Sequence, residues 1–136
     1  VQPFLDRTDK CSIILCRTSN PSAREIQDLV VDGKPLWQIV AEKVAQDWNA
    51  NSNCMLVAGA TYPSEIKSIR EIVGDMPLLI PGVGAQGGSV QRAVEAGLNS
   101  AQRGILLNSS RSIIFADNPG AASRQLRDEI NHCRKQ

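Results

Sequence analysis

The chain has 136 residues, with 15 Lys and Arg against 14 Asp and Glu, and a formal net charge of +1 at pH 7. This length suits one domain with a real hydrophobic core and is too short for two. The charge gives no electrostatic reason to expect binding to bulk nucleic acid or to an anionic membrane. No apolar run approaches the roughly 18 residues of a membrane span, and no signal-peptide pattern opens the chain.

In chain order, four short apolar runs are each followed by a helical pattern. The runs are continuous rather than alternating, which is typical of strands buried on both faces. Strands are expected at 12–16, 54–58, 76–80 and 104–107. Helices are expected at 1–5, 23–29, 36–49, 63–73, 90–97 and 119–135, with a break at 33–35. Asn20, Ser89 and Asn118 stand where helix N-caps belong.

The order βαβαβαβα implies an α/β protein with a parallel sheet and right-handed crossovers. Because a closed (β/α)8 barrel needs about 250 residues, four βα units amount to about half of one. An open four-stranded sheet is the alternative, and periodicity alone does not choose between the two. No linker interrupts the sequence, so residues 1–136 are expected to form a single unit.

Four cysteines and a single histidine limit the chemistry that the chain can carry. The thiols of Cys11, Cys16, Cys54 and Cys133 form neither Cys-x-x-Cys pairs nor a metal-binding spacing. We expect free thiols in a reducing compartment, the cytoplasm, with three of the four packed as small apolar side chains. His132 lies in the last helical pattern, away from any strand end. A Ser-His-Asp or Cys-His site is therefore not indicated, and no metal is expected.

Segment 80–89 leaves a predicted strand and enters a predicted helix, with glycine at positions 82, 84, 87 and 88. Glycine lets backbone N–H groups approach an anion closely, and a helix start adds unpaired N–H groups. The composition favours a phosphate site, and a tight turn without a ligand is the alternative. The segment also spells G-x-G-x-x-G, but no Asp or Glu closes the next strand, so a dinucleotide site is disfavoured.

Polar residues follow two other predicted strands. Arg111, after the fourth strand, can clamp a phosphate in a forked geometry, and phosphate sites of barrels often lie after strands 7 and 8. A surface ion pair between Arg111 and Asp117 is the alternative. Thr18 and Ser19, after the first strand, carry hydroxyl groups that can bind the edge of a heterocycle. No carboxylate pair with an adjacent lysine lies at a strand end, because the nearest D-x-K, residues 32–34, falls in a turn.

These motifs resemble, in the same order, four segments of the orotidine 5′-phosphate decarboxylase family. Segment 79–88, LIPGVGAQGG, resembles the phosphate loop that follows strand 7 of that family. Segments 15–21 (LCRTSNP), 57–61 (VAGAT) and 108–116 (NSSRSIIFA) resemble its strand 5, strand 6 and strand 8 motifs. The resemblance covers most of residues 12–122. It implies that the chain supplies strands 5 to 8, the C-terminal half of a TIM-type (β/α)8 barrel.

The resemblance also implies roles for individual residues. Ser19 would hydrogen-bond the pyrimidine ring, Gln86 would reach over the phosphate, and Arg111 would bind the phosphate with Ser110 beside it. The substrate-binding residues implied in this way are Ser19, Pro81, Gly82, Val83, Gly84, Gln86, Gly87, Gly88, Ser110 and Arg111.

For function, the resemblance implies a carboxy-lyase without a cofactor that converts orotidine 5′-monophosphate (OMP) to UMP and CO2 in pyrimidine biosynthesis. The family's Asp-x-Lys-x-x-Asp array would precede Val1, so no catalytic residue is expected here and the isolated chain is expected to be inactive. The expected partners are the nucleotide, an N-terminal half-barrel and a second subunit, with neither nucleic acid nor membrane. A non-catalytic module that binds phosphate or a dinucleotide is the alternative. A half-barrel that associates with itself through its open strand edges is a third hypothesis.

Overall fold

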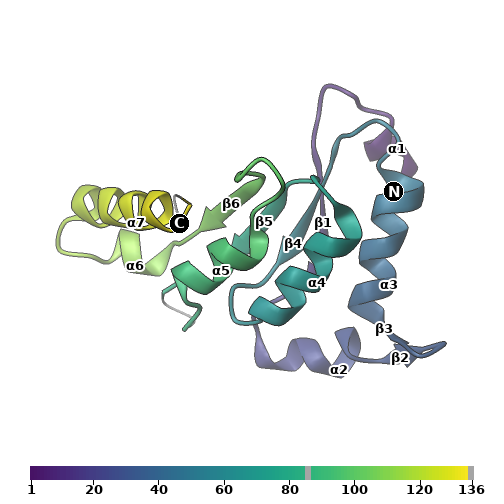
Figure 1. The fold of residues 1–136 in the computed structure, drawn as a ribbon, viewed down its shortest axis with the longest axis horizontal. Coiled ribbons are helices and arrows are strands. Elements are labelled where there is room, and N and C mark those ends of the chain that lie inside the picture. Colours follow the sequence, from purple (N-terminus) through teal and green to yellow (C-terminus); the bar gives the residue numbers. More distant parts are fainter. Residues whose placement is uncertain (85–86, 135–136) are drawn as a thin grey trace.

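The protein is built around a four-stranded parallel sheet with the strand order β1-β4-β5-β6 (Figure 1). The computed structural model describes residues 1–84 and 87–134. The sheet consists of β1 (Ser12–Arg17), β4 (Cys54–Ala58), β5 (Leu78–Pro81) and β6 (Ile105–Asn108). The strand bounds lie within one or two residues of those expected from the apolar runs, so the predicted parallel sheet is confirmed.

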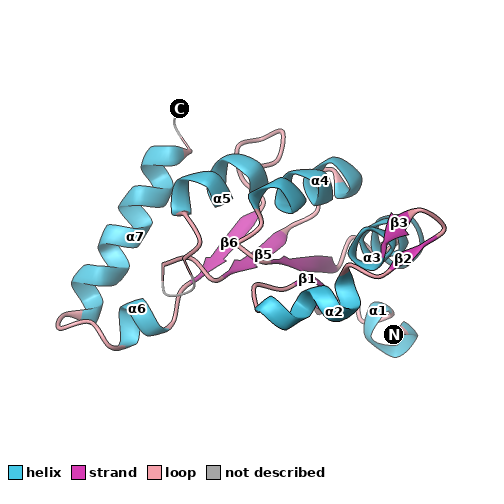
Figure 2. Ribbon diagram, turned by 90° about the horizontal axis from the view of Figure 1, so that it is seen from below, coloured by secondary structure: helices cyan, strands magenta, loops and turns pink. Residues whose placement is uncertain are grey.

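Helices connect successive strands. They are α1 (Gln2–Leu5), η1 (Pro21–Ala23), α2 (Arg24–Gln27), α3 (Leu36–Lys43), the π-helical η2 (Val44–Trp48), α4 (Pro63–Val73), α5 (Val90–Gly97), α6 (Arg111–Ile114) and α7 (Pro119–Cys133). Figure 2 shows α4 and α5 side by side along one face of the sheet, with α3 near one end of this layer and α7 near the other. The short helix α6 was not expected from the sequence.

Two of the three predicted N-caps form a side-chain cap hydrogen bond. The side chain of Ser89 accepts a hydrogen bond from the Arg92 N–H at 3.3 Å, and that of Asn118 accepts one from the Ala121 N–H at 2.9 Å. Asn20 also stands at the N-cap position of η1, directly before Pro21, but its side-chain amide donates to the Ser22 hydroxyl at 2.8 Å and its side chain forms no cap hydrogen bond.

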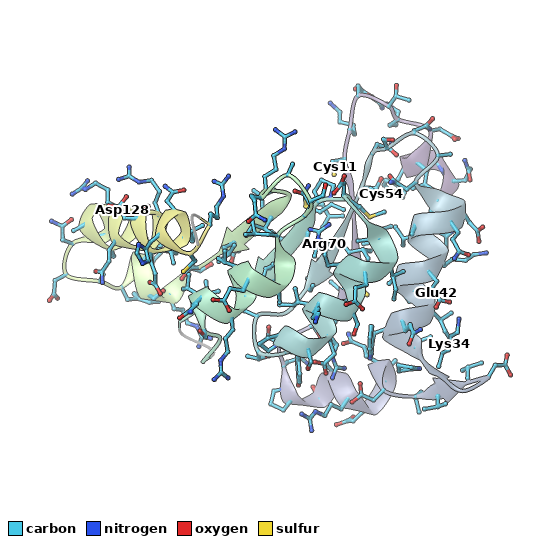
Figure 3. All side chains as sticks on the ribbon, in the orientation of Figure 1. Cys11, Lys34, Glu42, Cys54, Arg70 and Asp128 are labelled. Carbon is cyan, nitrogen blue, oxygen red and sulfur yellow. The ribbon has the colours of Figure 1, made fainter. Side chains whose placement is uncertain are left out.

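The break expected at residues 33–35 is a β-hairpin. Its strands are β2 (Val30–Val31) and β3 (Lys34–Pro35), which pair antiparallel. Asp32 and Gly33 both have positive φ, 51° and 78°, as a two-residue type I′ turn requires. An ion pair of 2.7 Å between Lys34 and Glu42 ties the hairpin to α3 (Figure 3). The D-x-K sequence at residues 32–34 therefore lies in this hairpin, outside the four-stranded sheet. The Lys34 side chain pairs with Glu42 of α3.

The core lies between the sheet and its helices. On the sheet side it includes Leu56, Leu78 and Ile80, and on the helix side Ile69 of α4 and Val94 of α5, each fully buried. The three strand residues alternate along the sequence with residues that face away from the helices, because successive side chains of a strand point to opposite faces. Helices therefore bury the centre of this sheet face, and Ile14, Ile105 and Leu107 of the edge strands pack against the core while partly buried.

The opposite face of the sheet carries apolar side chains that remain exposed at its two edge strands. Ile13 and Leu15 of β1 are 53% and 63% exposed, and Leu106 of β6 is 54% exposed. In the central strand β4, Met55 and Val57 are buried. An apolar face of this kind, with unpaired parallel strands at both edges, is unusual on an isolated domain.

The four thiols are free, as expected. Cys16, Cys54 and Cys133 are buried, and Cys11 is exposed. The Cys16 thiol donates to the Trp37 carbonyl at 3.1 Å, and burial raises its pKa to about 12. In the part of the chain that the structure describes, no helix is long and apolar enough to cross a membrane.

Candidate functional site

The carboxyl ends of β1, β4 and β5 are joined by hydrogen bonds at one edge of the sheet. The Pro81 carbonyl, at the end of β5, accepts from the Ala60 N–H at 2.9 Å and from the Ser19 hydroxyl at 3.3 Å. The Gly59 N–H donates to the Arg17 carbonyl at 2.7 Å. Ser19 therefore lies beside the first residues of the glycine loop, although 62 positions separate it from Pro81 in the sequence.

Three residues of the glycine loop, residues 82–88, have a backbone conformation that only glycine adopts readily. Gly82, Gly84 and Gly87 have φ of 95°, 74° and 81°. The Gly84 N–H donates to the Gly88 carbonyl, the Gly87 N–H to Gly84, and the Gly88 N–H to Gly82. These three N–H groups hold the loop closed on itself, so they are not free donors for an anion in this conformation.

Gly88 allows the loop to lie directly against the end of β4. A Cβ on residue 88 would lie 2.6 Å from the Ala60 Cβ and 2.8 Å from the Gly82 carbonyl oxygen. Both distances are shorter than van der Waals contact. Gly59 and Ala60, the small residues directly after β4, therefore leave the space in which the glycine loop packs.

A small hollow of about 80 Å³ lies between the ends of β5 and β6. It is lined by Pro81, Gly82, Val83, Asn108, Ser109, Ser110 and Arg111. The structure thus brings the start of the glycine loop together with the segment around Arg111. Five of the predicted site residues meet here, and Asn108 and Ser109 join them.

Arg111 is the first residue of α6 and is exposed. Among residues 1–84 and 87–134 its guanidinium forms no ion pair with Asp117, which was the alternative interpretation. The Ser109 hydroxyl lies 3.5 Å from the Val83 carbonyl, and the Ser110 hydroxyl lies 3.4 Å from the Asn108 side-chain oxygen. The charge of Arg111 is therefore available at the hollow.

Gln86 lies outside the described residues, so its role over the phosphate stays a prediction. The same holds for Ser19 as a ligand of the pyrimidine, although its position beside Pro81 is clear. Within the described ranges, no cluster of three His, Cys, Asp or Glu side chains could hold a metal ion.

One residue at this edge was missed by the sequence analysis. Arg17, the last residue of β1, is 2% exposed and forms ion pairs with Asp28 and Glu65. The signal was present, because an arginine directly after the five residues of a strand predicted to be buried must either leave the core or pair with carboxylates there. Its partners come from two later segments, which the sequence pattern does not bring together.

The model of the orotidine 5′-phosphate decarboxylase / HUMPS family matches residues 1–126. The chain belongs to this family. It is 51% identical over 138 residues to orotidine 5′-phosphate decarboxylase of Janthinobacterium sp. (strain Marseille), covering 96% of this chain and 51% of that protein. It is 49% identical over 141 residues to the same enzyme of Cupriavidus necator, covering 98% of this chain and 52% of that protein. The chain spans about half the length of the curated relatives it matches.

Solved structures of decarboxylases share the fold. The OMP decarboxylase of Leishmania donovani superimposes with a TM-score of 0.92 at 37% identity, over 99% of this chain and 52% of that one. The UMP synthase of the same organism gives a TM-score of 0.94 at 41% identity, over 98% of this chain and 30% of that one. The predicted fold class is confirmed: the four-stranded parallel sheet of this chain, open at both edges, matches about half of an OMP decarboxylase barrel.

Proposed function

We propose that this chain forms the nucleotide-binding part of an orotidine 5′-phosphate decarboxylase, a carboxy-lyase that converts OMP to UMP and CO2. The observation that carries the proposal is the hollow between the ends of β5 and β6, with the unpaired, exposed guanidinium of Arg111 at its margin in the described structure. Membership of the family supports it, and so do the names of the relatives, which are decarboxylases.

In this proposal Arg111 binds the phosphate of the nucleotide through a charge-assisted, forked hydrogen bond. Ser110 and the start of the glycine loop complete the phosphate site, and Gln86 covers it. Ser19 binds the pyrimidine from the end of β1. The phosphate lies far from the reacting ring carbon, so its binding energy serves to align the ring and close the site rather than to change any bond.

Decarboxylation leaves negative charge on a ring carbon, which a nearby cation stabilises and a proton donor then neutralises. The strand ends of this chain, residues 17–19, 59–62, 81–84, 87–88 and 108–111, contain neither lysine nor a carboxylate. We therefore place the reactive groups outside these segments and expect that the 136-residue chain alone does not turn over OMP. Measurable CO2 release by the purified chain would contradict this part of the proposal.

The exposed apolar face of the sheet supports a partner that completes the barrel. Ile13, Leu15 and Leu106 are more than half exposed at the two edge strands, and a complementary set of four strands would cover them. In the proposed enzyme this partner is the N-terminal half of the barrel. A homodimer of the complete barrel and a cytoplasmic location, both expected from the family resemblance, belong to the same proposal.

The phosphate site is tested by titrating the chain with UMP and following binding by calorimetry. Replacing Arg111 by Ala removes a charged hydrogen-bond donor worth about 1.5–3 kcal/mol, so UMP should bind about 10- to 100-fold more weakly. Arg103→Ala is the matched control, because Arg103 is exposed at the opposite end of β6, and it should leave the affinity unchanged. Equal losses in the two variants, or equal affinity of the wild-type chain for UMP and NADP⁺, would contradict the proposed site.

A further inference from the structure

Arg17 carries a buried positive charge that links the end of β1 to two later elements. Its side chain is 2% exposed. Its Nη1 lies 2.7 Å from an oxygen of Asp28, which follows α2, and its Nη2 lies 3.7 Å from an oxygen of Glu65 in α4. The guanidinium carbon is 4.2 Å from the centre of the Tyr62 ring, directly before α4. One side chain thus contacts the end of α2 and the start of α4 together.

This arrangement is poorly explained by stability alone. Taking a guanidinium out of water is unfavourable, and an apolar side chain of similar volume often packs in such a place with equal or greater stability. The Nε of Arg17 also has no hydrogen-bond partner within the described part of the chain. Two carboxylates and an aromatic face compensate for its burial, and these groups define where the guanidinium must lie.

The same elements hold the residues that follow Arg17. The side-chain oxygen of Gln27, in α2, accepts from the Thr18 N–H at 3.0 Å, and its amide nitrogen donates to the Thr18 hydroxyl at 3.1 Å. The Arg17 carbonyl accepts from Gly59 at 2.7 Å. Ser19 then donates to the Pro81 carbonyl. Residues 17, 18 and 19 are therefore each fixed by a different partner: α2 supplies the partner of Thr18, and Asp28, directly after α2, pairs with the Arg17 side chain.

We propose that Arg17 is a positioning residue for base recognition: by tying β1 to α2 and α4, it sets the place of the Ser19 hydroxyl at the pyrimidine end of the site. This rests on the proposed function, since Ser19 is assigned there to the pyrimidine. The phosphate end is built from β5 and β6 and contains none of the contacts of Arg17. Loss of Arg17 should therefore weaken binding of the base and spare binding of the phosphate.

The test compares UMP with ribose 5-phosphate, which lacks the base, on the 136-residue chain. For Arg17→Met we expect affinity for UMP to fall about 10-fold, the size of one lost hydrogen bond, and affinity for ribose 5-phosphate to stay within twofold. Arg24→Met is the matched control, because Arg24 also lies over the Tyr62 ring, at 5.6 Å, but is exposed. It should change neither affinity. Arg17→Lys keeps the charge without the fork and should restore part of the UMP affinity.

A merely structural role would lower both affinities together or neither, and either result in Arg17→Met overturns the proposal. Should that variant not fold, Asp28→Asn loosens the same cluster from its more exposed side, at 41% exposure, and should shift the UMP to ribose 5-phosphate ratio in the same direction. An unchanged ratio in Asp28→Asn would then overturn the proposal. A wild-type chain that binds neither compound refutes the proposed function, and this proposal falls with it.

Discussion

Gly59 and Ser19 are packed so closely that no side chain fits between them: a Cβ on residue 59 would lie 2.4 Å from the Ser19 hydroxyl oxygen and 2.8 Å from its backbone nitrogen. Residue 59 follows β4 and Ser19 follows β1, so the contact fixes the end of one strand against the next. The absence of a side chain at position 59 is what allows Ser19 to reach the Pro81 carbonyl.

Replacing Gly59 by Ala should displace Ser19 and destabilise the protein. Overpacking of a tight contact typically costs about 1–3 kcal/mol of unfolding free energy, and the displaced hydroxyl should also weaken UMP binding. Gly120→Ala is the control, because a Cβ there, in the first turn of α7, meets only Arg124 and Asn118 side-chain atoms at 3.4–3.5 Å. Urea unfolding and calorimetry should show both effects in Gly59→Ala and neither in the control.

Arg70 should contribute strongly to stability without affecting ligand binding (Figure 3). Its guanidinium donates to the carbonyls of Gly97, Gly104 and Met76, which lie at the end of α5 and before β5 and β6. Arg70→Met removes the side-chain donor of the Gly97 and Met76 carbonyls, while the Gly104 carbonyl keeps the Leu78 N–H, so we expect a loss of about 2–4 kcal/mol in unfolding free energy. Lys67→Met, on an exposed position of the same helix, should cost less than about 0.5 kcal/mol.

The affinity of Arg70→Met for UMP should match that of the wild type, measured well below its melting temperature. The carbonyls that Arg70 binds lie at the amino ends of β5 and β6, whereas the proposed site lies at their carboxyl ends. A large loss of affinity in the folded variant would show that the two ends of the sheet are coupled.

Stability should fall at alkaline pH because of Cys16. Burial raises the pKa of this thiol from its ordinary value of 9.0 to about 12, and only the neutral thiol can donate to the Trp37 carbonyl. Above pH 9 the unfolded chain therefore loses a proton that the folded chain keeps, and unfolding becomes more favourable by about 1.4 kcal/mol per pH unit up to pH 12.

The comparison that isolates this effect is Cys16→Ser, which keeps a donor for Trp37 and does not titrate in this range. Between pH 8 and pH 10.5 the wild type should lose about 2 kcal/mol more unfolding free energy than the variant. Parallel curves for the two proteins would mean that the Cys16 thiol ionises in the folded state as easily as in the unfolded one.

The uncovered sheet face should make the isolated chain associate. Leu15 is 63% exposed on β1, an edge strand with unpaired backbone groups, and Leu15→Lys should favour the monomer by placing a charge on this edge. Ile26→Lys, equally exposed on α2, should leave association unchanged. Light scattering across a concentration series measures both. A wild-type chain that stays monomeric throughout would contradict the prediction.

Local sequence signals predicted the elements well where each signal acts within a few residues. The Ser89 and Asn118 caps depend on side chains that bond backbone groups three residues ahead, so sequence alone located them. The hairpin at residues 30–35 carries an equally local signal, Asp32-Gly33 directly after Val30-Val31, where the sequence analysis predicts a helix break. Asn20 occupies the N-cap position of η1 but forms no side-chain cap hydrogen bond, and its side-chain amide donates to the Ser22 hydroxyl instead.

In the proposed site, too, features that depend on residue type were predicted from the sequence, and features that depend on contacts between distant residues were not. The glycine loop and Arg111 were identified because their residue types point to phosphate chemistry in any parallel sheet. The burial of Arg17 and the fit of Ser19 against Gly59 were not foreseen. Both depend on contacts between residues 11 to 48 positions apart, and no periodicity specifies which distant side chains will meet.

By itself, then, the sequence determined the order of the four sheet strands and of the longer helices, and the two segments proposed to bind a phosphate, because periodicity, caps and glycine content act through neighbouring residues. Only the tertiary structure decided that four strand ends meet around Pro81 and the β6 loop, and that one sheet face stays uncovered. The reason is physical: these features arise from how the strands pack side by side, and packing is a property of the whole chain.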